Sequence, residues 1–131
     1  MLRRCTCQRG TLREFYEKRN RCQFRAPAQM MLTLLPLLEA DLGDREVWGL
    51  TSHLALHLKS VDDWQAESGA TIAPTRDGFK VGHKKATGEW VWFGTASPEE
   101  ACRIALAEMV DSTSDGMSRS DLRGGIDVAS S

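Results

Sequence analysis

The chain lacks any apolar run long enough to cross a membrane. Its 131 residues contain no stretch of about 18 consecutive apolar side chains, and the arginine-rich amino terminus has no apolar core of the secretory-signal kind. An excess of charge of one sign is also missing, because 17 basic residues stand against 18 acidic ones. We therefore expect one soluble domain that is cytoplasmic and uses no membrane.

The common catalytic motifs are absent as well. No G-x-S-x-G, P-loop or H-E-x-x-H pattern occurs. The four cysteines do not form two C-x-x-C pairs, so no zinc or other metal site is expected. Cys102 falls on the apolar face of a predicted helix, where a reactive thiolate is disfavoured. The sequence thus predicts a protein that is not an enzyme and needs no metal or cofactor.

Charge is unevenly distributed along the chain. Residues 1–29 hold eight basic and two acidic side chains, whereas residues 30–131 hold nine basic and 16 acidic ones. This pattern predicts a flexible basic arm over 1–29 that binds phosphate, binds an acidic partner or folds back on its own domain. The alternative is a reading frame extended upstream of Met30. In either case, a chain that begins at Met30 is expected to fold.

Three helices are predicted before residue 60. Thr11 and Glu14 have the spacing of a capping box and predict a short basic helix over 11–24, followed by a linker at 26–28. The leucine-rich segment 32–42 predicts a second helix, with Thr33 as its N-cap, Pro36 in its first turn and Gly43 at its end.

The third predicted helix covers residues 47–58. Its apolar stripe, repeated at helical spacing, consists of Val47, Leu50, Leu54 and Leu58. Trp48 and Leu56 lie outside this stripe, so they either contact a partner or are covered by another layer of the domain. His53 and His57 are interpreted as solvated or edge histidines rather than as metal ligands.

An antiparallel meander is predicted after residue 69. Segments 70–74, 79–85 and 89–93 have extended patterns, and Asp77-Gly78 and Thr87-Gly88 form the turns between them. Alternation along the strands places Lys80, Lys84, Trp90 and Trp92 on the face opposite to Phe79, Val81, His83, Val91 and Phe93. The face with tryptophan and lysine either contacts an outside partner or is covered by helices.

The clearest local signal is Ser97-Pro98-Glu99-Glu100, a serine N-cap with proline and glutamate in the following turn, which predicts a helix. Residues 112–131 are rich in serine, glycine and aspartate and are expected to be disordered. The predicted class is therefore α+β, a three-stranded antiparallel meander packed against helices in the order α-α-β-β-β-α. This core domain covers 30–111, between the basic arm and the disordered tail at 112–131.

Two segments carry a resemblance to a known family. LLPLLEADLGDREVW at 34–48 and GTASPEEACRIALAEM at 94–109 resemble small phage and prophage proteins of the ABA-sandwich family. The resemblance implies an antiparallel sheet between helices. The phage context implies a monomer or homodimer that occupies a surface of a host protein or ribonucleoprotein complex, such as a CRISPR effector, and inhibits it. The candidate partner-binding residues are Trp48, Leu56, Lys80, Lys84, Lys85, Trp90 and Trp92.

A second resemblance supports an alternative function. VWFGTASPEEACRIAL at 91–106 is similar to the end of AP2-like DNA-binding domains, which read the major groove with arginines and tryptophans of their sheet. The resemblance implies a DNA-binding module that uses the sheet and the basic arm. Its candidate nucleic-acid contacts are Arg76, Lys80, Lys84 and Lys85 from the sheet and Arg13, Arg19 and Arg21 from the arm.

Overall fold

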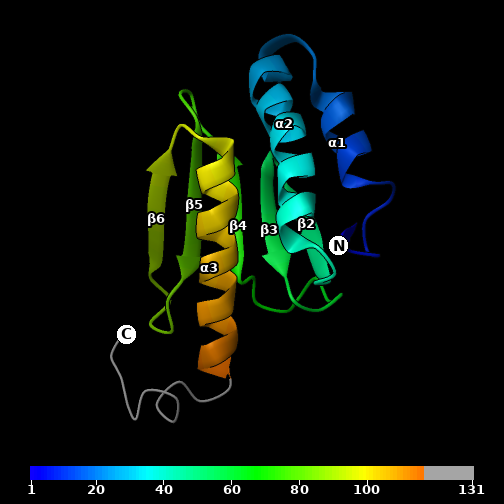
Figure 1. Cartoon of the computed structure of the whole chain (residues 1–131). Helices are drawn as coiled ribbons and strands as arrows, with labels where there is room; N and C mark the ends of the chain where they lie inside the picture. The colour runs from blue at the N-terminus through cyan, green and yellow to red at the C-terminus, as the bar shows by residue number, and fades with distance from the viewer. Residues whose placement is uncertain (117–131) are drawn as a thin grey trace.

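The computed structural model describes residues 1–116, which form a six-stranded mixed sheet with three helices (Figure 1). The elements are β1 (Leu2–Arg4), α1 (Leu12–Arg19), a 3-10 turn (Cys22–Phe24), α2 (Arg25–Leu42), β2 (Val47–Ser52), β3 (Ala55–Lys59), β4 (Ala70–Pro74), β5 (Phe79–Lys84), β6 (Trp90–Thr95) and α3 (Pro98–Gly116). The strands lie side by side in chain order. β1 is parallel to β2, and every later neighbouring pair is antiparallel.

All three helices lie on one face of the sheet (Figure 1). The core fills the space between the helices and that face. Its fully buried aliphatic and aromatic side chains include Tyr16 from α1, Met31, Leu34 and Leu38 from α2, Leu56 and Leu58 from β3, and Ile72 and Val81 from β4 and β5. Since none of the helices in residues 1–116 covers the opposite face, that face is the place to look for exposed side chains.

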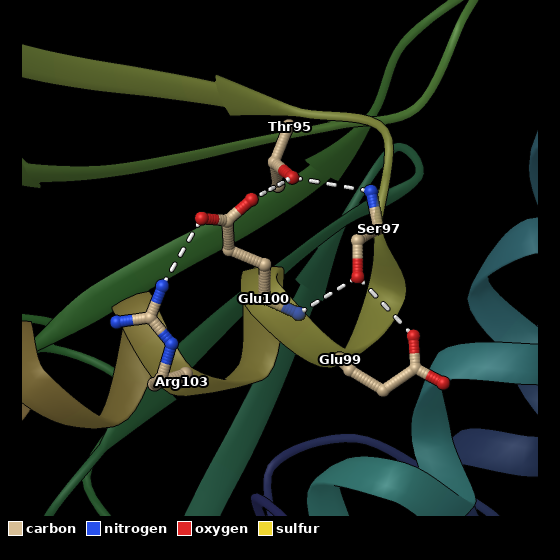
Figure 2. Close-up of polar contacts among 5 residues, drawn as sticks. All are labelled: Thr95, Ser97, Glu99, Glu100 and Arg103. Atoms are coloured by element: carbon tan, nitrogen blue, oxygen red, sulfur yellow. Dashed lines mark hydrogen bonds and ion pairs between the residues drawn. The ribbon is translucent and has the colours of Figure 1, made fainter.

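Local chemistry explains where two of the helices begin. The side chain of Thr11 accepts a hydrogen bond from the backbone N–H of Glu14, and Glu14 accepts one from the backbone N–H of Thr11, so α1 has the predicted capping box. At the start of α3, the Ser97 hydroxyl accepts from the N–H of Glu100 at 3.1 Å (Figure 2). In a capping box, the Glu100 carboxylate would accept the backbone N–H of Ser97. Here the Thr95 hydroxyl accepts that N–H and donates to the Glu100 carboxylate.

The predicted three-stranded fold is wrong, because residues 47–58 form a β-hairpin instead of a helix. Inward side chains alternate in β2 and β3, as in Val47, Gly49 and Thr51. The turn between these strands passes through His53 at φ 56°, without the glycine that usually marks a hairpin. The leucines of this segment fit the period of a helix as well as that of a strand. Pairing of the segment with β1 and β4 inside the sheet favours the strand.

The expectation of a flexible arm is also wrong. Residues 2–4 pair with β2, and α1 packs on α2. The predicted linker at 26–28 lies inside α2, which begins at Arg25 and contains both Thr33 and Pro36. Residues 112–116 continue α3, against the prediction of disorder from residue 112. The rest of the predicted tail, 117–131, lies outside the described residues. The helices of residues 1–116 lie on one side of the sheet, whereas the phage-family resemblance implies a sheet between helices.

Candidate functional site: the open face of the sheet

The strand residues that point away from the helices form what we call the open face. They alternate with the core residues along each strand and comprise Arg3, Trp48, Leu50, Ser52, Ala55, His57, Lys59, Thr71, Ala73, Lys80, Gly82, Lys84, Trp90, Trp92 and Gly94. Side chains differ in exposure across this face: Lys59 and Thr71 are only 2% exposed, and the Lys59 ammonium donates to the backbone carbonyl of Ala66. Trp90 and Trp92 are 41% and 42% exposed, which is high for such large apolar side chains.

A tryptophan pair occupies the β5–β6 side of the open face. The indole rings of Trp90 and Trp92 are stacked, with centroids 5.3 Å apart and planes inclined by 12°. The Lys80 ammonium lies 4.7 Å from the centroid of the Trp92 ring, in a cation–π contact. Gly82 is opposite Trp92 in the register, and a Cβ atom on it would come within 2.4 Å of the indole. The sequence therefore leaves space on β5 for this ring to lie flat.

A groove crosses the open face beside this pair. It has a volume of about 860 Å³ and runs from the N-terminal turn of α2, over the β2–β3 turn, to the two tryptophans. Its lining includes Phe24, His57, Arg76 and Lys80. The groove thus joins an aromatic surface to two exposed cations.

The strands contribute positive charge and no negative charge. None of the six described strands contains Asp or Glu, while Lys80 and Lys84 are exposed on the open face. All 18 acidic residues of the chain lie outside these strands. An anionic partner can therefore approach the open face without meeting a carboxylate from its strands.

His57 lies in the middle of the open face. Its Nδ1 is 2.8 Å from the hydroxyl oxygen of Thr71. Burial, and then the charge of Lys59, lower the pKa of His57 below its ordinary value. The imidazole is consequently neutral at pH 7 and contributes a hydrogen-bonding group rather than a charge.

The structure places the predicted partner-binding residues in different parts of the molecule. Trp90, Trp92, Lys80 and Lys84 gather on the open face, and Trp48 lies half-buried at its β2 side. Leu56 is fully buried in the core, so the prediction that it contacts a partner is wrong. It points to the helical side because the segment is a strand, not a helix.

The predicted nucleic-acid contacts are separated as well. Arg76 lines the groove, whereas Lys85 is in the β5–β6 turn, 3.9 Å from the Glu89 carboxylate. Of the three arm residues, Arg19 lines a second cleft, beside α1. Arg13 instead pairs with Glu17 on the surface of α1 at 2.9 Å, and Arg21 lines neither the groove nor that cleft.

Two chemical features of residues 1–116 bear on metal and thiol chemistry. There, no cluster of three or more His, Cys, Asp or Glu side chains is arranged to hold a metal ion. Burial raises the pKa of the Cys102 thiol to about 12, so this sulfur stays protonated. Within the same residues, the helices are too short or too polar to span a bilayer.

The sequence analysis missed most of the second cleft. Arg4, Arg9 and Lys18 line it together with Arg19. The only sequence signal was the excess of basic residues before residue 30, which does not show which of them converge. Comparisons with protein-family models, with curated proteins and with solved structures find no significant match.

Proposed function

We propose that this protein is a non-enzymatic module that binds single-stranded nucleic acid, without strict sequence preference, on the open face of its sheet. The observation that supports it most is the exposed Trp90–Trp92 stack with Lys80 beside it, on strands without any carboxylate. Aromatic side chains stack on bases of any sequence, and nearby cations neutralise the backbone phosphates.

This proposal develops the DNA-binding alternative of the sequence analysis. The inhibitor of a host complex, expected from the phage-family resemblance, is the competing proposal and would use the same tryptophans as hot spots. The absence of acidic residues from the strands favours a polyanion over an average protein surface, which carries both signs of charge. A cytoplasmic location suits either proposal, because Cys5, Cys7 and Cys102 are unpaired thiols.

The test is a titration of a fluorescently labelled oligothymidine with the full chain, read by anisotropy. Replacing Trp92 by alanine should remove a stacking contribution of about 1–3 kcal/mol, which weakens binding at least about fivefold. With about three phosphates contacted, affinity should also fall roughly 20-fold between 50 and 200 mM salt.

Phe93 provides the matched control. It is the next residue on β6, points to the opposite face and is 42% exposed, like Trp92. Phe93→Ala should therefore leave the affinity unchanged. Equal losses in Trp92→Ala and Phe93→Ala would contradict the assignment to the open face. No oligonucleotide binding at 50 mM salt would reject the proposed function and favour a protein partner.

A further inference from the structure

A second cleft lies where the N-terminal segment, α1 and the β2–β3 turn meet. Its volume is about 860 Å³, and four basic side chains line it: Arg4, Arg9, Lys18 and Arg19. Glu14 is the one acidic residue in the lining, and its carboxylate already accepts the backbone N–H of Thr11 at 2.8 Å. We call this the cationic cleft.

The four cations form no salt bridge with a described residue, although the Glu14 carboxylate in the same lining attracts Arg4. Among residues 1–116, salt bridges involve other basic side chains, and none includes Arg4, Arg9, Lys18 or Arg19. Partial burial, and then the charge of Arg19, lower the pKa of Arg4 from its ordinary value. The positive charges therefore repel one another, and a bound anion would relieve that repulsion.

Two of the guanidinium groups are held in place before any ligand arrives. Arg4 donates to the Gln8 side chain at 3.2 Å and to the Thr51 hydroxyl at 2.9 Å. Arg19 lies 3.7 Å from the centroid of the Phe15 ring and donates to the carbonyl of Phe15. Binding an anion here costs little side-chain entropy, since these groups are already ordered.

The other two cations are free to reach a ligand. Arg9 and Lys18 are exposed, and no hydrogen bond of either side chain to another described residue is present in residues 1–116. Arg9 takes part in the fold through its backbone carbonyl, which accepts a hydrogen bond from Arg4. The cleft thus combines two guanidinium groups held by contacts within the fold with two exposed cations.

The cationic cleft adjoins the groove on the open face. Phe24, His53 and Leu54 line both. Phe24 is 46% exposed and gives the junction an aromatic surface. A chain of alternating phosphates and bases could therefore pass from the cations, over these shared residues, to the tryptophan pair.

We propose that the cationic cleft is a phosphate-binding site, and that it takes either a backbone phosphate of the strand on the open face or the phosphates of a free nucleotide. The first source rests on the proposed function, whereas the second does not. The shared chemistry is a phosphate dianion or diester between guanidinium and ammonium groups, beside an aromatic wall.

The experiment is a titration of the isotope-labelled full chain with inorganic pyrophosphate, ATP and oligothymidine, followed by amide chemical shifts. Pyrophosphate should shift amides of 8–10, 18–19 and 53–54. The double variant Arg9→Ala/Lys18→Ala should weaken pyrophosphate binding about tenfold or more, as expected for losing charge-assisted contacts. Arg13→Ala is the matched control on the same helix and should have no effect, because Arg13 is paired with Glu17 outside the cleft.

The outcomes distinguish the two sources and the two proposals. Tighter binding of oligothymidine than of ATP, weakened by the double variant, identifies the strand as the source; the reverse order identifies a free nucleotide. Pyrophosphate binding without oligothymidine binding would leave the cleft a phosphate site and reject the proposed function. The phosphate site would be overturned if the cleft amides do not shift at 10 mM pyrophosphate, or if Arg13→Ala weakens pyrophosphate binding as much as the double variant does. This holds even if Trp92→Ala weakens oligothymidine binding.

Discussion

Replacing Tyr16 by alanine tests whether the basic N-terminal segment is part of the core. Tyr16 is fully buried, its ring is 5.0 Å from that of Phe15 in an edge-to-face contact, and its hydroxyl donates to the carbonyl of Leu54 at 3.1 Å. Truncation of a buried aromatic residue to alanine costs about 3–5 kcal/mol. For a chain of this length, that loss lowers the melting temperature by roughly 10–20 °C.

The assay is thermal unfolding followed by circular dichroism, with Arg13→Ala as the control. Arg13 is on the same helix but exposed, and its pair with Glu17 should contribute less than about 0.5 kcal/mol. Removing residues 1–29 altogether deletes the buried side chains of Leu12, Phe15 and Tyr16. Burial alone, without any cavity cost, contributes about 1.5–3 kcal/mol for each of these side chains, and the sum approaches the whole stability of a small domain. Contrary to the expectation from the sequence, a chain that begins at Met30 should therefore not fold. A melting temperature within about 3 °C of the parent in Tyr16→Ala would refute this reasoning.

Three further predictions concern the open face, the start of α3 and pH. Gly82→Ala should weaken oligothymidine binding, measured by anisotropy, because the new Cβ would come within 2.4 Å of Trp92 and displace its ring. Unchanged affinity would contradict the claim that binding requires the Trp92 ring to lie flat over Gly82. Ser97→Ala removes the cap of α3 (Figure 2) and should cost about 1 kcal/mol in urea unfolding; no shift of the urea midpoint would contradict this role. The lowered pKa of His57 means that the unfolded chain binds the proton more tightly, so stability should be full above pH 6.5 and decline below it. His57→Gln should flatten that decline, and an equally steep decline in the variant would assign it to other groups.

Local chemistry predicts the second half of the chain well. β4, β5 and β6 lie within about two residues of the predicted strands, since the turns at Asp77-Gly78 and Thr87-Gly88 mark their ends. The alternation that assigns Trp90 and Trp92 to the face opposite Phe93 follows from the two-residue period alone. The sequence also predicts the N-cap at Ser97, because the donors and acceptors of this cap all lie within six consecutive residues.

The first half depends on contacts between distant residues, which a local pattern does not contain. β1 is three residues long and is placed by its pairing with β2, more than 40 residues away, and by the hydrogen bond from the Leu2 N–H to the Glu39 carboxylate of α2. The register of β2 turns position 49 inward, where the Leu12 and Leu56 side chains leave little room for a Cβ, so that glycine fits there. α2 begins after Phe24 without a side-chain cap, so its first turn gave no sequence signal and Pro27 suggested a linker.

The candidate site also has one part that the sequence predicts and one part that only the structure reveals. Trp90, Trp92 and Lys80 were identified from the meander, and only the exposure of their face needed the structure. The cationic cleft was not identifiable, because its cations come from β1, the following loop and α1, and close against the β2–β3 turn. Convergence of this kind is a tertiary property that charge counting cannot locate.

Photo-crosslinking is the most direct test that single-stranded nucleic acid binds the open face. The full chain is irradiated with an oligothymidine that contains 5-iododeoxyuridine, and the linked peptides are identified by mass spectrometry. The account predicts adducts on Trp90 or Trp92 and their loss as salt rises, because the base stacks on these rings and the phosphates meet Lys80. Adducts confined to the outer surfaces of α2 and α3, or no adduct at 50 mM salt, would contradict it.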